Sequence, residues 1–223
     1  MKTLEVLPVF TPEQCDRLAK HVVNQAHYMI KRGEGFYTLG ASTYLDDPMH
    51  YEGIAANTNI LLEREFPAVL VAVDAVLSEH FKVPATHTNI HSNGLALPGF
   101  HIFDSNSAGL EGSVHIDEPY DRIDWRGVEW HSPFSFTVPL QLPTLGGGLD
   151  YWPNVTDEEM ETYEREGALP PFEYLAYAVG NMYLHDGHTP HRISNRHPVP
   201  LDEYRISIQG HGVHTADGIV VYF

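Results

Sequence analysis

The pattern of residue types after Pro84 constrains the fold more than any other feature of the sequence. From there to the end, short β-prone runs alternate with stretches rich in Gly, Pro, Asn and Asp. Many short strands separated by turn signals are typical of an antiparallel sandwich or barrel. The predicted strands are residues 86–91, 97–103, 113–117, 134–142, 149–152, 174–179, 182–185, 192–195, 205–210 and 219–222. We therefore expect residues 85–223 to form a cupin-like jelly roll.

The first 84 residues favour helices instead. Over residues 11–30, Thr11 can cap a helix, Pro12 suits its first turn and Gln14 completes a capping box, while apolar residues recur every three or four positions. A second helical region is predicted from about Asn59 to Phe81, with Pro67 starting its main segment. We found no internal repeat and no linker. The prediction is a mainly β chain with flanking helices, in which residues 1–223 form one domain and residues 1–84 support the jelly-roll core.

Two longer segments, residues 118–132 and 154–171, interrupt the predicted strands. Within the second, residues 156–166 are acidic and suit a short helix. Long ordered segments in compact domains often line binding sites, although both could equally cover the ends of a barrel.

Composition excludes several kinds of partner. The formal net charge is −17, which argues against sustained contact with nucleic acid or anionic lipid. No apolar run approaches the roughly 18 to 20 residues that cross a bilayer, so we expect no membrane span. The single cysteine, Cys15, cannot form an internal disulfide, and the first ten residues lack a signal-peptide core, so we expect a cytoplasmic protein. The sequence does not indicate an oligomeric state.

The chain has 15 histidines, and histidine is the most frequent metal ligand in proteins. The first candidate is the triplet His115-Ile116-Asp117, because residues i and i+2 of a strand point to the same face and can share a metal. The other such triplet, His50-Tyr51-Glu52, follows a predicted turn and is the weaker candidate.

Further histidines lie in the segment from His185 to His191. His185, His188 and His191 have helical spacing, but Gly187 and Pro190 disfavour a helix there. We expect a strand, a tight loop and a second strand that opens at His191, with His188 as the fallback ligand.

The alternating segment Tyr204–Gln209 predicts a buried cation. If Ile206 and Ile208 pack between layers, Arg205 and Ser207 face the interior of the barrel. A buried guanidinium is costly unless it meets an anion, and its planar fork matches a carboxylate, so we expect a carboxylate ligand at Arg205. A second Arg-x-Ser, residues 192–194, faces outward if His191 faces inward.

The order His115-x-Asp117, His191 and Arg205-x-Ser207 resembles the Fe(II)- and 2-oxoglutarate-dependent oxygenases, whose fold is a double-stranded β-helix of the jelly-roll kind. The resemblance covers roughly residues 85 to 215. It implies that His115, Asp117 and His191 are the catalytic metal ligands for Fe(II), and that Arg205 and Ser207 bind the far carboxylate of 2-oxoglutarate. It also implies that O2 is consumed, that succinate and CO2 form, and that an unactivated C–H bond is hydroxylated.

The substrate is less constrained. A small molecule, such as a free amino acid or a natural-product intermediate, is expected, with Glu118, Tyr120 and Trp152 as candidate contacts. The acidic residues Glu118 and Asp121 would suit a basic amino acid.

Several alternatives remain. A peptidyl or prolyl hydroxylase would use the same chemistry, a cupin-like zinc or manganese enzyme would not use 2-oxoglutarate, and a jelly-roll binding module would not be an enzyme. The pair Arg205 and Ser207 favours the oxygenase, since neither of the last two needs an interior arginine at that spacing.

Overall fold

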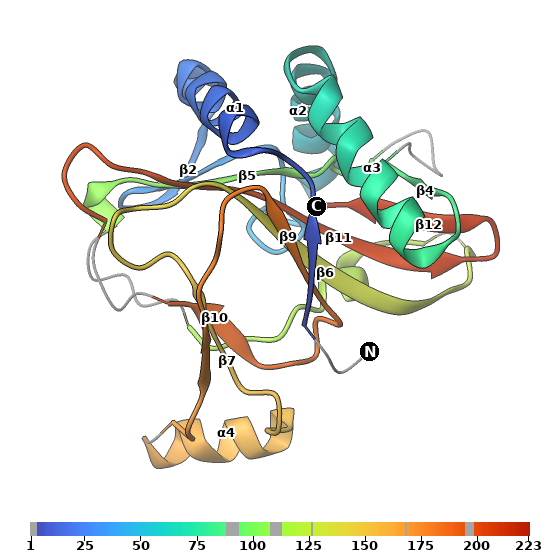
Figure 1. Cartoon of the computed structure of the whole chain (residues 1–223). Coiled ribbons are helices and arrows are strands. Elements are labelled where there is room, and N and C mark those ends of the chain that lie inside the picture. Colours follow the sequence, from blue (N-terminus) through green and yellow to red (C-terminus); the bar gives the residue numbers. More distant parts are fainter. Residues whose placement is uncertain (1–3, 88–93, 108–112, 126, 168, 195–198) are drawn as a thin grey trace.

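A large sheet separates three helices from a small sheet in the computed structural model of this chain (Figure 1). The structure describes residues 4–87, 94–107, 113–125, 127–167, 169–194 and 199–223. The main sheet has the order β1-β9-β6-β11-β5-β3-β2; off this path, β12 pairs with β11, and β4 pairs with β12. Its strands are β1 (Glu5–Pro8), β2 (Ile30–Gly33), β3 (Phe36–Leu39), β4 (Ala85–Thr86), β5 (Gly99–Phe103), β6 (Trp130–Gln141), β9 (Asn181–His185), β11 (Arg205–Thr215) and β12 (Gly218–Tyr222).

The minor sheet lies on the side of the main sheet opposite to these three helices (Figure 1). It has the order β10-β7-β8, from β7 (Leu149–Tyr151), β8 (Glu173–Leu175) and β10 (His191–Ile193). All described strand pairs are antiparallel except β4 with β12. Two facing, largely antiparallel sheets are the arrangement expected of a jelly roll.

Most predicted strands are present, but two differ. Residues 113–117 form no strand: only His115 makes a bridge, to His191, because the next main-chain donor, Asp117 N–H, bonds to Gly187 in a turn. The run predicted over 86–91 contributes β4 up to Thr86, and residues 88–91 lie outside the described residues.

The helices are α1 (Pro12–Asn24), α2 (Tyr51–Glu65), α3 (Pro67–Phe81) and α4 (Asp157–Glu166). The capping box at Thr11 and Gln14 is present. However, α1 ends at Asn24 and a short 3-10 turn, η1 (Ala26–Tyr28), leads into β2, because residues from Ile30 pair with β3 instead of continuing the helix. The sequence also missed β1, β2 and β3, which bring part of the first 84 residues into the main sheet.

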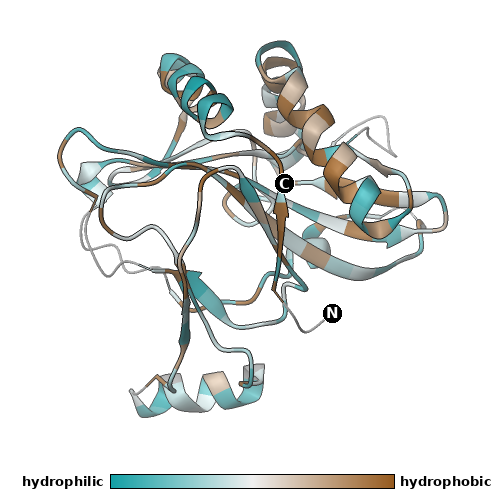
Figure 2. Cartoon of the chain, viewed as in Figure 1, coloured by the Kyte–Doolittle hydropathy of each residue, from teal (hydrophilic) through white to brown (hydrophobic). Residues whose placement is uncertain are grey.

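The core lies between the helices and the main sheet. Ile206 and Ile208 are fully buried there, in one cluster with Val73 and Leu77 of α3. Of the four helices, α3 has the most hydrophobic residues, whereas α4, beyond the minor sheet, is mainly hydrophilic (Figure 2). Because strand residues alternate between faces, burial of these isoleucines turns Arg205 and Ser207 away from the helices, as predicted. Within the described residues, none of the helices combines the length and the apolar character that crossing a membrane requires.

Candidate functional site

A cavity of about 740 Å³ lies between the two sheets. Its walls come from β3, β5, β6, β9 and β11 on one side, from β7 and β10 on the other, and from the segment between Ser113 and Arg122. A cavity of this size accommodates a small molecule or cofactor.

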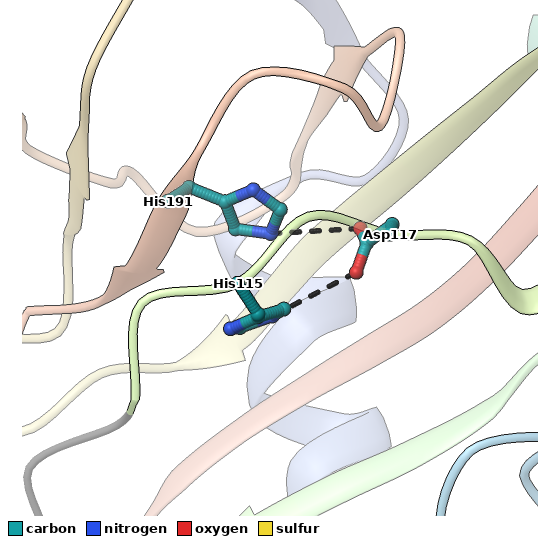
Figure 3. A group of neighbouring side chains, drawn as sticks. All are labelled: His115, Asp117 and His191. Atoms are coloured by element: carbon teal, nitrogen blue, oxygen red, sulfur yellow. Dashed lines mark ion pairs between the residues drawn. The ribbon is translucent and has the colours of Figure 1, made fainter. Parts of the chain in front are cut away.

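Three predicted ligands meet at this cavity (Figure 3). The segment with His115 and Asp117 lies along the edge of the minor sheet, because His115 and His191 exchange main-chain hydrogen bonds of 3.0 and 2.9 Å. The His115 Nε2 atom lies 3.7 Å from Asp117 Oδ1, and the His191 Nε2 atom lies 3.5 Å from Asp117 Oδ2. One ligand atom from each residue falls within 4.8 Å of the others, so the three could hold a metal ion.

Both histidines present the correct nitrogen for a metal. His115 Nδ1 lies 2.9 Å from the carbonyl oxygen of Ser113, and His191 Nδ1 lies 2.8 Å from that of Thr189. A carbonyl oxygen only accepts, so Nδ1 carries the proton in both rings, and each neutral ring keeps a lone pair on Nε2. Main-chain partners of this kind orient the imidazoles of metal sites.

The charges at the site suit a cation. Burial by itself raises the pKa of Asp117, but the imidazoles around it, His191 foremost, lower the pKa to well below its ordinary value. Burial also lowers the pKa of His191, which keeps this ring neutral and able to bind metal near neutral pH. The site therefore combines one carboxylate with two imidazoles that present Nε2, a donor set that suits Fe(II).

Arg205 faces the same cavity and is 3% exposed. Its Nη1 atom donates a long hydrogen bond of 3.4 Å to Ser207 Oγ, and its Nε atom has no partner. The guanidinium lies 5.6 Å from the ring centre of Phe103 and 5.9 Å from that of Tyr177. Within the described part of the chain, no carboxylate forms an ion pair with it. A buried cation in this state fits an anionic ligand such as the far carboxylate of 2-oxoglutarate.

Ser207 differs from the expectation in its position. Its hydroxyl accepts hydrogen bonds from Arg205 and, at 3.0 Å, from Gln209, and the side chain is fully buried and does not line the cavity. Ser207 therefore orients Arg205 and does not itself reach a ligand in the cavity.

The other Arg-x-Ser is outside the cavity, as the alternation predicts. Arg192 Nε lies 3.3 Å from Asp150 Oδ2, and its guanidinium packs over Trp152 and Phe172. His191 and Ile193 both line the cavity, so Arg192 between them lies on the opposite face of β10.

Of the three candidate substrate contacts, only Glu118 lines the cavity. Asp121 and Arg122 line it too. Tyr120 does not: it is 7% exposed and packs with Trp130 at a ring distance of 4.9 Å. Trp152 is fully buried away from the cavity, and its indole donates to the Pro170 carbonyl oxygen. The expectation for Tyr120 and Trp152 is corrected accordingly, because an aromatic side chain next to a site can serve the packing behind it.

Sequence reasoning missed three polar residues of the cavity wall, His101, His211 and Tyr44. The Tyr44 hydroxyl lies 3.2 Å from His101 Nε2, and Ser135 Oγ lies 2.8 Å from His211 Nδ1. Burial lowers the pKa of His101 to about 3 and that of His211 to about 4, so both are neutral near pH 7. The alternation of Arg205, Ser207 and Gln209 could have revealed His211, since it continues on the same face of β11.

Comparison with known proteins supports the fold. No protein-family model matches the sequence, and no curated protein is significantly similar to it. An N-substituted L-amino acid dioxygenase from Burkholderia ambifaria AMMD superposes with a TM-score of 0.58 at 16% identity, over 99% of this chain and 86% of that one. The same enzyme in complex with alpha-KG gives a TM-score of 0.60 at 13% identity, over 99% and 86%. AviO1 from Streptomyces viridochromogenes Tue57 gives 0.51 at 13% identity, over 96% and 90%. The chain thus has the jelly-roll fold of these proteins, and a His-Asp-His group that could bind a metal lies inside it, as its resemblance to the 2-oxoglutarate-dependent oxygenases implies.

Proposed function

We propose that this chain is an Fe(II)- and 2-oxoglutarate-dependent oxygenase that hydroxylates an unactivated C–H bond of a small molecule. The observation that carries the proposal is the shared cavity: the buried Arg205, which has no described counterion, faces the same space as His115, Asp117 and His191. A metal-binding protein of another kind needs the triad but not the buried cation. In this proposal residues 1–223 form one catalytic domain in a reducing, cytoplasmic setting, where the buried Cys15 stays a thiol.

Each part of the site has a separate task. His115, Asp117 and His191 would hold Fe(II), and Arg205, oriented by Ser207, would bind the far carboxylate of 2-oxoglutarate. When bound, Fe(II) with 2-oxoglutarate and O2 supplies the oxidation of a C–H bond, with release of succinate and CO2. The residues of the chain fix the positions of the reactants in the cavity that they line.

The remaining wall of the cavity would receive the substrate. Glu118 and Asp121 are exposed at its surface, and neither forms an ion pair with a described cation. Two unpaired carboxylates attract a cationic group, so a free amino acid with a basic side chain is the substrate class we propose. The dioxygenase from B. ambifaria, which is named for N-substituted L-amino acids, agrees with an amino acid in a cavity of this fold.

Anaerobic visible spectroscopy tests the proposal without a known substrate. The metal-free protein is titrated with Fe(II) and then with 2-oxoglutarate, and the charge-transfer band of the chelated cosubstrate is followed. We expect the band in the wild type, its loss in His191→Ala, and a far higher requirement for 2-oxoglutarate in Arg205→Ala.

Matched controls are available in the same chain. His188→Ala removes an exposed histidine of the same loop, and Arg192→Ala removes the arginine of the outward-facing Arg-x-Ser, so both should keep the band. Iron binding without a band would reject the cosubstrate and favour a cupin-like metalloenzyme. An intact band in Arg205→Ala would reject the role of Arg205.

The substrate class has its own test. Succinate release is measured with basic, neutral and acidic amino acids, and Glu118→Gln with Asp121→Asn should raise the KM for the basic ones. Unchanged kinetics at low salt would reject the cationic substrate, and turnover of a prolyl peptide alone would favour a peptidyl hydroxylase.

A further inference from the structure

His185 lies beside the triad but is not one of its three ligands. It ends β9, it is 9% exposed, and its ring packs against that of His191 with 4.6 Å between centroids. Its Nε2 atom points toward Asp117, 4.0 Å from Oδ2. A histidine this close to a metal site is either a further ligand or a group that acts on a ligand.

The protonation of the ring distinguishes these roles. The Gly187 N–H donates to His185 Nδ1 at 3.2 Å, so Nδ1 carries a lone pair and the proton lies on Nε2. This tautomer is the opposite of that in His115 and His191, whose Nδ1 atoms carry the proton. His185 therefore offers an N–H group where the two ligands offer lone pairs.

Gly187 makes hydrogen bonds to both the His185 ring and the main chain of Asp117. Its carbonyl oxygen accepts from the Asp117 N–H at 2.8 Å, while its own N–H holds the His185 ring. The φ of Gly187 is +80°, and a Cβ atom there would lie 2.9 Å from the Asp117 carbonyl oxygen, so only glycine allows this close approach. One residue thus fixes both the backbone of Asp117 and the imidazole that faces its carboxylate.

We propose that His185 is a positioning residue: its Nε2–H holds Asp117 Oδ2, so that Asp117 binds the metal through Oδ1 alone. Closing the present distance to a hydrogen bond needs a shift of about 1 Å. A carboxylate held in this way occupies one coordination position instead of two, which leaves room for other ligands on the metal. The inference rests on the metal site of the proposed function.

Cobalt(II) is a suitable probe, because its visible absorption reports the number and type of ligands. Co(II) is titrated into the metal-free forms of the wild type, His185→Leu and His185→Gln. We expect His185→Leu to bind Co(II) about 10 to 100 times more weakly and with an altered spectrum, as for other groups that orient metal ligands. His185→Gln should restore both the affinity and the spectrum, because the glutamine Nε2–H can replace that of the imidazole.

His101→Leu is the control, since it removes another buried histidine of the same cavity whose hydrogen bond goes to Tyr44 instead of Asp117. If His185→Leu does not fold, His185→Phe retains a ring against His191 and gives the same comparison. Wild-type affinity and spectrum in the apolar variant would overturn the inference, and so would a glutamine variant as impaired as the leucine variant. Failure of the wild type itself to bind Co(II) through the triad would instead reject the proposed function.

Discussion

Replacement of Arg205 by methionine should make the ligand-free protein more stable and greatly weaken its response to 2-oxoglutarate. Arg205 is 3% exposed and has no ion-pair partner in the described chain, and burial lowers its pKa, which means that the protein disfavours the charge. Methionine fills a similar, elongated volume without a charge.

The magnitude follows from the contacts of the guanidinium. Burying such a charge costs several kcal/mol. The cation–π contacts with Phe103 and Tyr177 offset at most about 2 kcal/mol of this cost each, and the long hydrogen bond to Ser207 offsets less than about 1 kcal/mol. We expect Arg205→Met to raise the free energy of unfolding by about 1 to 3 kcal/mol. For a chain of this size, that corresponds to a Tm increase of about 2 to 12 °C.

Thermal unfolding with Mn(II), which binds without turnover, measures both effects. In the wild type, 2-oxoglutarate at 100 times its Kd should add about 2.7 kcal/mol, whereas the same concentration should add much less in Arg205→Met, in which only the metal would hold the cosubstrate. A variant that is less stable than the wild type without ligand would refute the idea of an uncompensated charge. A variant that this concentration of 2-oxoglutarate stabilises as much as the wild type would refute the carboxylate site.

Three further predictions concern stability. Gly187→Ala should lower the free energy of unfolding in urea by about 1 to 3 kcal/mol, because alanine is strained at a φ of +80° and its Cβ meets Asp117; an unchanged midpoint would contradict this. Asp46→Ala should cost about 3 to 5 kcal/mol, since it leaves the Arg32 guanidinium, now 2.5 and 2.8 Å from the carboxylate oxygens, buried without a counterion; a loss below 1 kcal/mol would argue against this. Because burial lowers the pKa of His211 from 6.5 to about 4, the unfolded chain binds more protons in that range, so stability should decrease as the pH falls from 6.5 to 4. The decrease should be smaller in His211→Gln, and equal slopes in urea titrations would exclude His211 as a contributor.

Features that depend on near neighbours could be predicted from short-range patterns in the sequence. The capping box at Thr11 set the start of α1, and the alternation at Ile206 and Ile208 decided that Arg205 points away from the helices. Both are short-range patterns, because a cap involves residues three apart and a strand alternates every second residue.

Features that depend on distant partners could not be predicted in this way, because the folded chain brings those partners together. His115 lies at a single bridge and not in a strand, since its pairing is set by His191, and β2 replaces the end of the first predicted helix because β3 pairs with it. The distinction between His185 and the proposed ligand His191 is a further example. Both are buried histidines in one segment, and only their hydrogen bonds, to the Gly187 N–H and the Thr189 carbonyl oxygen, give them opposite protonated nitrogens. Backbone geometry in the folded turn sets those bonds, so no pattern of residue types could have specified them.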